Sequence, residues 1–404
     1  MPFPYKLTSV SSPSDIKKRL EQNWIHLLKA KSAKLVLDII DGSSPPSVFV
    51  GSYGYPKVKI GPMISPAHGD TTILDKTELW AGKGFEQIVD YRLSLVRGIF
   101  PINVYETTGR FLENLQELAM SERPAESEAT FERKLLVGIE LEKEMSLNTE
   151  IAPFGPSAPL KTFKASALSA DQRIESAYYD TDLRTGDAVM QLYRHNVPVS
   201  SIHRVLSVGM LGQKNRRKIV PTRWSISATD DIISSGLVKA NEKNPTIDLF
   251  EVTWYSHLAN YYCVILIPDD VWSFEMIESW FTNDGQIVTG ADYEDVRGID
   301  HYPSIAGAYF AARLAVAEHL AEKRRKAAAL VLREIHPEYI MPLGVWQIRE
   351  AIREALKKSP QKFETLDAAL TFATTNLSMS KQEIFQKSRL WQTFKSQTRI
   401  TDFA

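Results

Sequence analysis

The feature that most constrains the fold is a pair of strand-like segments joined by a short turn. Residues 246–255 and 261–267 are rich in β-branched and aromatic side chains, and the sequence His-Leu-Ala-Asn at 257–260 lies between them. Two such runs with a short connection predict an antiparallel β-hairpin. The second run is almost wholly apolar and contains the single cysteine, Cys263, so we expect a buried strand and an unreactive thiol.

The segments on either side of this hairpin predict an α+β fold. Before it, residues 48–64 alternate β-branched residues with glycine and proline, which predicts two short strands joined by a glycine turn, and residues 133–168 also have strand character. Apolar residues at helical spacing predict helices at 85–97, 272–281, 305–335, 346–356, 366–374 and 381–391.

A turn signal, Asn-Asp-Gly at 283–285, predicts a domain boundary. We therefore expect a mixed α/β N-terminal domain with antiparallel strands at residues 1–284. A mainly helical C-terminal domain at 285–391 and a flexible tail at 392–404 would follow.

Composition limits what the protein can bind. The 48 basic and 49 acidic residues leave a formal net charge of −1, which argues against a protein that coats nucleic acid over its whole surface. Any contact with DNA must therefore be local. A single cysteine excludes a disulfide framework and a zinc finger. The chain has no leader-like N-terminus and no long apolar stretch, so we expect a cytoplasmic protein without membrane contact.

The best candidate for DNA contact is a basic segment at residues 209–225. Its lysines and arginines can contact phosphates, and its tryptophan can stack on an unpaired base. The candidates are Lys214, Arg216, Arg217, Lys218, Arg223 and Trp224. The alternative is a solvated loop whose tryptophan belongs to the core. A glycine-rich segment at 51–57 has two tyrosines, and Lys57 and Lys59 could also touch a nucleic-acid backbone, but we favour a plain surface hairpin there.

A run of acidic residues before the predicted helix at 305–335 is the best candidate for a metal site. It contains Asp292, Glu294, Asp295, Asp300 and His301. Oxygen ligands suit Mg²⁺ or Mn²⁺, the ions used in phosphodiester cleavage. However, the spacing matches no EF-hand loop, and Arg297 can simply pair with a neighbouring carboxylate. Both interpretations stay open.

The C-terminal residues 397–404 carry a polar, an aliphatic and an aromatic anchor, Gln397, Ile400 and Phe403, at a spacing of three. In a 3₁₀ turn these side chains lie on one face and can enter a groove. The pattern resembles the peptide by which replication and repair proteins bind the DNA sliding clamp (PCNA-type). Ala404 stands where the usual motif has a second aromatic residue, so we expect weak binding. The alternative is a frayed polar terminus.

Several segments together resemble the archaeal Nre DNA repair family. They are VFVGSYGYPKVKIGPM at 48–63, YRLSLVRG at 91–98, KIVPTRWS at 218–225, and DYED at 292–295 before YFAAR at 309–313. The resemblance implies a role in repair of damaged DNA and a clamp-binding peptide at the C-terminus. Many members carry an N-terminal four-cysteine zinc motif, which this chain lacks, so it resembles the zinc-free variety.

Three functions follow from these features. The first is a repair factor that contacts DNA through residues 214–223 and is tethered to the clamp by its tail. The second is a metal-dependent nuclease or related phosphodiester enzyme that uses residues 292–301. The third is a repair scaffold whose helical C-terminal region binds another protein and never touches DNA. The resemblance implies no reaction that maps onto residues, so enzyme status stays open, as does the oligomeric state.

Overall fold

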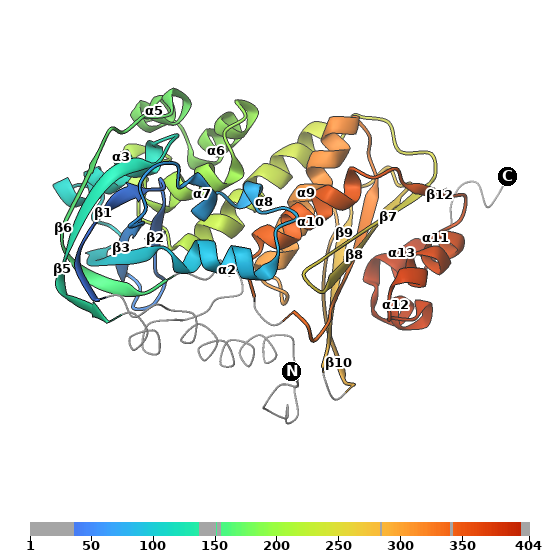
Figure 1. Cartoon of the computed structure of the whole chain (residues 1–404). Coiled ribbons are helices and arrows are strands. Elements are labelled where there is room, and N and C mark those ends of the chain that lie inside the picture. The colour runs from blue at the N-terminus through green and yellow to red at the C-terminus, as the bar shows by residue number, and fades with distance from the viewer. Residues whose placement is uncertain (1–35, 137–150, 152–154, 283–284, 340–341, 397–404) are drawn as a thin grey trace. The chain divides into compact units, whose positions relative to one another are not determined.

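A computed structural model describes residues 36–136, 151, 155–282, 285–339 and 342–396 (Figure 1). The chain forms two compact units. The N-terminal unit contains the described residues up to Ile233 together with Pro342–Trp346. The C-terminal unit contains residues 234–339 and 347–396 of the described chain.

The N-terminal unit is built on a six-stranded sheet with the order β1-β5-β6-β4-β3-β2. Its strands are β1 (Val36–Ser44), β2 (Val48–Val50), β3 (Lys57–Ile64), β4 (Val96–Asn103), β5 (Ala125–Leu136) and β6 (Ser157–Ser166). Neighbours are antiparallel except β4 and β6, which are parallel. At the start of β3, Lys57 and Lys59 are exposed while Val58 and Ile60 are buried, because successive side chains of a strand point to opposite faces.

The helices of this unit position the basic segment. They are α2 (Phe85–Leu93), α3 (Arg110–Met120), α5 (Gln172–Tyr179), α6 (Thr185–Arg194), α7 (Val199–Ser207) and α8 (Thr222–Asn241), with 3₁₀ turns η1 (Thr72–Leu74), η2 (Thr77–Leu79) and η3 (Lys214–Arg216). Helix α7 buries Ile202, Val205 and Leu206, which lie on one face at helical spacing. In α3, the Gln116 side chain donates a hydrogen bond to the Val208 carbonyl at 3.0 Å. This bond holds the C-terminal end of α7, where the basic segment begins.

The C-terminal unit is built on a second six-stranded sheet, with the order β10-β9-β11-β8-β7-β12. Its strands are β7 (Phe250–His257), β8 (Asn260–Ile267), β9 (Phe274–Phe281), β10 (Ile287–Glu294), β11 (Ala328–Ile335) and β12 (Gln361–Phe363). Strand β11 lies inside the sheet and is buried along its whole length. Its two charged side chains are bonded: Arg333 donates to Glu278 and Asn260, each at 2.9 Å, and Glu334 accepts the Met379 backbone N–H at 2.7 Å.

Besides the end of α8, the described helices of this unit are α9 (Gly307–Lys323), α10 (Trp346–Leu356), α11 (Leu366–Ala373), α12 (Lys381–Lys387) and α13 (Arg389–Ser396), with the turn η4 (Thr374–Asn376). Residues of α11, α12 and α13 pack with the inner residues of the sheet in one apolar cluster, which includes Leu370, Ile384 and Trp391. Helix α13 is capped by Glu275 of β9, whose carboxylate accepts the backbone N–H groups of Arg389 at 2.8 Å and Leu390 at 3.1 Å. The chain is thus anchored as far as this last described helix.

The α+β class and the mainly helical character of the C-terminal part are confirmed. The predicted hairpin is also present, since β7 and β8 pair antiparallel with His257 opposite Asn260. Cys263 is fully buried in β8, and this burial raises the pKa of its thiol, as expected for an unreactive group.

Two helix predictions are wrong. Residues 274–281 form strand β9, and the helix predicted to reach residue 335 ends at Lys323 and is followed by strand β11. Arg324 has left-handed backbone angles (φ 51°, ψ 49°), which end an α-helix. Because β9 and β11 are buried on both faces, their side chains show no alternation of apolar and polar residues, and such runs cannot be told from buried helices by periodicity.

The two units divide between Ile233 and Ser234, within α8. Strands β9 and β10, on either side of the boundary predicted at 284, pair antiparallel with each other. Residues 392–396, assigned from the sequence to the tail, belong to α13. Within the described ranges, no helix is long and apolar enough to cross a membrane.

Candidate nucleic-acid interface

Three loops of the N-terminal unit meet at one edge of its sheet. They are the turn between β2 and β3, the residues that follow β4, and the segment between α7 and α8. Backbone hydrogen bonds join them: Val104 N–H donates to the Pro56 carbonyl at 3.0 Å, and Ile219 N–H donates to the Val104 carbonyl at 2.9 Å. The Val50 N–H also donates to the Thr222 hydroxyl at 2.9 Å. The glycine-rich segment and the basic segment, far apart in sequence, therefore lie side by side.

These loops expose four aromatic side chains. The exposed fraction is 95% for Tyr53, 63% for Tyr105, 43% for Tyr55 and 38% for Trp224. The rings of Tyr55 and Trp224 pack against each other, with centroids 5.2 Å apart and planes tilted by 58°. Partial burial and a hydrogen bond with Tyr105 raise the pKa of Tyr55. Exposed aromatic rings held by a rigid scaffold are suited to stacking with a flat ligand.

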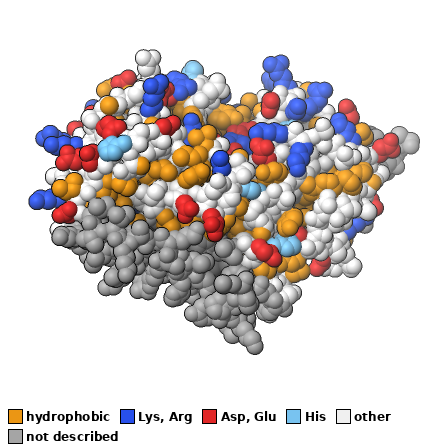
Figure 2. Space-filling model, in the orientation of Figure 1, with side chains coloured by type: hydrophobic (Ala, Val, Ile, Leu, Met, Phe, Trp, Pro, Cys, Tyr) orange, Lys and Arg blue, Asp and Glu red, His pale blue; other side chains and the backbone are white. Residues whose placement is uncertain are grey.

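Exposed cations come from the same loops and from the strand beside them. Lys57 and Lys59 lie on β3, while Lys214, Arg216 and Lys218 lie in the basic segment. The four aromatic residues and these five cations are called the aromatic–basic surface below. Figure 2 shows basic and acidic side chains interspersed on the face in view.

Arg217 has a different role from its neighbours. Its guanidinium donates to the carbonyls of Gly212 and Tyr178, each at 2.7 Å, and lies over the Tyr178 ring at 5.0 Å. Burial lowers the pKa of Arg217. Arg217 therefore ties the loop to the end of α5. The loop also needs a glycine at position 212, because Gly212 has φ +102° and a Cβ there would lie 2.3 Å from the Thr185 hydroxyl oxygen. Arg223, the remaining candidate, is half-buried in the first turn of α8.

The first two carboxylates of the acidic segment are bonded to protein donors. Asp292 accepts the backbone N–H groups of Ser304 and Ile305 and the Ser304 hydroxyl, each at 2.9 Å, and so fixes the turn that enters α9. Glu294 is buried and accepts from Arg313 Nε and Trp272 Nε1, each at 2.6 Å.

The other members of the segment pair with their neighbours. Asp295 forms a bidentate pair with Arg297, whose hydrogen bonds lower the pKa of that carboxyl to about 2. Asp300 and His301 bond each other at 2.9 Å, and this bond raises the pKa of His301. Among the residues that the structure describes, no group of three or more His, Cys, Asp or Glu side chains is placed to hold a metal ion. The expected Mg²⁺ or Mn²⁺ site stays a prediction.

The predicted clamp-binding residues Gln397, Ile400 and Phe403 lie outside the described residues. Sequence reasoning did not name Tyr105, which follows β4 and has no local signal beyond its aromatic side chain. It also favoured a plain surface hairpin for residues 51–57, because the packing of Tyr55 on Trp224 depends on a contact between distant segments.

Comparison with known proteins identifies relatives across nearly the whole chain. Family models described as archaeal Nre, N-terminal, and archaeal Nre, C-terminal, match residues 21–284 and 294–403. The DNA repair protein NreB of Archaeoglobus fulgidus is 37% identical over 86% of this chain and 88% of the relative. The DNA repair protein NreA is 35% identical in A. fulgidus, over 85% and 86% of the two chains, and 33% identical in Haloferax volcanii, over 91% and 89%. No solved structure matches. These matches confirm the resemblance, and the chain belongs to the archaeal Nre family.

Proposed function

We propose that this protein is a DNA repair factor that binds DNA through the aromatic–basic surface and is recruited to DNA by the sliding clamp through its C-terminal peptide. Relatives of similar length are named DNA repair proteins. The observation that carries the proposed DNA contact is the exposed ring pair of Tyr55 and Trp224, with lysines on the adjoining strand and loop.

The chemistry of this surface suits unpaired bases better than an intact duplex. Every base has a π-face, and stacking on an aromatic side chain is worth about 1–3 kcal/mol per base without regard to sequence. The surrounding lysines and Arg216 can contact phosphates, which position a strand but do not read its sequence. We therefore expect a preference for single-stranded segments, such as those at damaged or branched DNA, over paired DNA.

The proposed clamp contact rests on the spacing of Gln397, Ile400 and Phe403. Burial of Ile400 and Phe403 would contribute about 3–6 kcal/mol before the cost of ordering the peptide, so binding is expected to be micromolar or weaker. Helix α13, which immediately precedes the peptide, is packed on the sheet of the C-terminal unit and capped by Glu275. The chain is therefore held on the C-terminal unit up to the residue before the peptide.

Two variants test the division of roles. Phe403→Ala should abolish binding to a purified archaeal sliding clamp in calorimetry and leave the affinity for single-stranded DNA unchanged. Trp224→Ala should weaken binding to single-stranded DNA and leave clamp binding unchanged. A chain truncated after Ser396 serves as the reference for complete loss of the peptide. Equal clamp binding by the intact and truncated chains would refute the recruitment role, and loss of both activities in either variant would refute their separation.

The carboxylates of Asp292, Glu294 and Asp295 are all hydrogen-bonded to protein donors, and these contacts support structural roles.

A further inference from the structure

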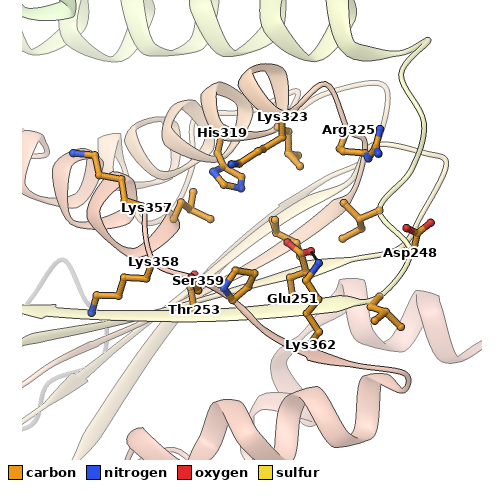
Figure 3. A pocket seen from close by; sticks show the side chains of 16 residues that line it. Asp248, Glu251, Thr253, His319, Lys323, Arg325, Lys357, Lys358, Ser359 and Lys362 are labelled. Carbon is orange, nitrogen blue, oxygen red and sulfur yellow. Dashed lines mark ion pairs between the residues drawn. The ribbon is translucent and has the colours of Figure 1, made fainter.

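The C-terminal unit contains a cavity of about 550 Å³, a size typical of small-molecule sites. It lies between strand β7, the C-terminal end of α9 and the segment that joins α10 to β12 (Figure 3). Its apolar lining comes from Ile247, Leu249, Leu266, Leu320, Leu356 and Pro360. The cavity belongs wholly to one unit and is distinct from the aromatic–basic surface.

The wall of this cavity is basic, with five lysine or arginine residues and two acidic ones. They are Lys323, Arg325, Lys357, Lys358 and Lys362, and Asp248 and Glu251. Three of the cations have other partners. Lys362 pairs with Glu251 at 2.8 Å, Lys357 pairs with Glu354, and Lys358 lies over the Tyr255 ring at 5.2 Å. Figure 3 shows Lys357 and Lys358 directed away from the centre of the cavity.

The two remaining cations also line the cavity, and Figure 3 shows Lys323 beside His319 and Arg325 on the side of Asp248. Within the described residues, neither Lys323 nor Arg325 forms an ion pair or a side-chain hydrogen bond. His319 lies one helical turn before Lys323 on α9, so both side chains project from the same face of the helix, and Figure 3 shows them pointing into the cavity. Burial and the nearby Lys323 ammonium lower the pKa of His319. The imidazole is therefore neutral at pH 7 and offers one N–H donor.

A buried hydroxyl on the opposite wall gives an independent sign of a ligand. Thr253 of β7 is only 6% exposed and lines the cavity, yet its hydroxyl has no hydrogen-bond partner among the described residues. Buried polar side chains nearly always have a partner, and leaving one without it destabilises the fold. An oxygen acceptor bound in the cavity between Thr253 and α9 would supply the missing bond.

We propose that this cavity binds the phosphate monoester of a nucleotide, with Lys323 and Arg325 as the cations that attract the phosphate, Thr253 as a hydroxyl donor, and the sugar and base against the apolar lining. A phosphate offers several acceptor oxygens and a negative charge, which match two cations without counter-ions and a free hydroxyl. The volume holds a mononucleotide. The same chemistry is presented by a free nucleotide and by the 5′-phosphate end of a DNA strand.

The test is calorimetry on the full-length chain with four probes: a deoxynucleoside 5′-monophosphate, the corresponding deoxynucleoside, and a short single-stranded oligonucleotide with either a 5′-phosphate or a 5′-hydroxyl. The variants are Lys323→Ala and the near-isosteric Thr253→Val. Lys239→Ala is the matched control, because Lys239 is an exposed lysine in the last turn of another helix, α8, and does not line the cavity.

We expect the monophosphate to bind and the nucleoside to bind at least about tenfold more weakly. Lys323→Ala and Thr253→Val should each weaken monophosphate binding several-fold, while Lys239→Ala should not.

If the 5′-phosphorylated oligonucleotide binds with the same dependence on Lys323, the ligand is a DNA end. If only the monophosphate binds in this way, the ligand is a free nucleotide. Equal binding of nucleotide and nucleoside, no binding of any probe, or equal effects of Lys323→Ala and Lys239→Ala would overturn the proposal. Trp224→Ala should leave monophosphate binding intact, so failure here is distinguishable from failure of the proposed DNA surface.

Discussion

Replacement of Trp224 by alanine should weaken binding to single-stranded DNA without changing its salt dependence. Trp224 is 38% exposed, and its ring packs on the Tyr55 ring. Loss of one stacked base is worth about 1–3 kcal/mol, which corresponds to an affinity about 5- to 140-fold lower. The substitution removes no cation, so the slope of log affinity against log salt should stay the same.

Fluorescence anisotropy with a labelled single strand at several salt concentrations measures both quantities. Trp224→Phe should recover most of the affinity, because it keeps an aromatic face. Lys57→Ala should behave differently: it should lower affinity and also reduce the magnitude of the salt slope by about 0.7, the value for one phosphate contact on a single strand. Tyr179, which is 70% exposed in the same unit but does not belong to the aromatic–basic surface, provides the control Tyr179→Ala.

Loss of the ring pair also affects stability, and this effect must be separated from binding. An aromatic pair contributes about 0.5–1.5 kcal/mol beyond its buried area, so Trp224→Ala should unfold at a somewhat lower temperature but remain folded in the assay. Circular dichroism melts check this. Affinity within twofold of the unmodified protein, or an equal loss in Tyr179→Ala, would refute the assignment of base stacking to Trp224.

Further predictions concern residues whose contacts are structural. Glu275→Gln should lower the free energy of unfolding in urea by about 1–3 kcal/mol, because an amide NH₂ group replaces one of the two oxygens that accept the backbone N–H groups of α13. Burial raises the folded-state pKa of Glu275 above 4.5, so its contribution is greatest below pH 4.5 and is lost as the pH rises through the folded pKa; a Gln variant with the same pH profile would contradict this. Arg217→Ala should destabilise the protein by about 1–3 kcal/mol and leave the salt slope of DNA binding unchanged, whereas a reduced slope would show that Arg217 contacts phosphate. Asp292→Asn should cost about 1–3 kcal/mol of stability equally with Mg²⁺ and with a chelator, and a cost that appears only with Mg²⁺ would reveal a metal site. In NMR titrations the Asp295 carboxyl should stay ionised down to about pH 2, and Arg297→Ala should move its pKa back towards 3.8.

Local patterns in the sequence predicted those elements whose burial is one-sided or whose ends carry turn signals. The β7–β8 hairpin, the strands β2 and β3 and the helix α10 appear where they were expected. Strands β9 and β11 did not, because they are buried on both faces and their periodicity is lost. The left-handed conformation at Arg324, which ends α9, occurs in a run of charged residues that otherwise favours helix.

The candidate sites were less predictable than the elements, because their residues come from distant segments. The basic segment was identified from its charges, but its position beside Tyr55 depends on sheet pairing and loop contacts. Likewise, the cavity draws on β7, α9 and the segment after α10. In the sequence, Lys323 resembles any lysine near a helix C-terminus, where a cation stabilises the helix dipole. The buried hydroxyl of Thr253 across the cavity is what indicates that Lys323 contacts a ligand and does not merely stabilise the end of α9.

The charge of the chain also explains why recruitment and contact would be divided between two parts of the protein. A formal net charge of −1 and five cations on the aromatic–basic surface give only a weak electrostatic attraction to DNA at physiological salt. Stacking on two or three rings adds a few kcal/mol, which still favours rapid dissociation. A clamp that encircles DNA and holds the C-terminal peptide would raise the local concentration of the protein to the millimolar range, and two weak contacts would then act as one strong one.

Doubling the salt concentration should therefore release the isolated protein from DNA far more readily than the protein on clamp-loaded DNA. If both dissociate at the same salt concentration, the peptide provides no tether and the surface must hold DNA alone.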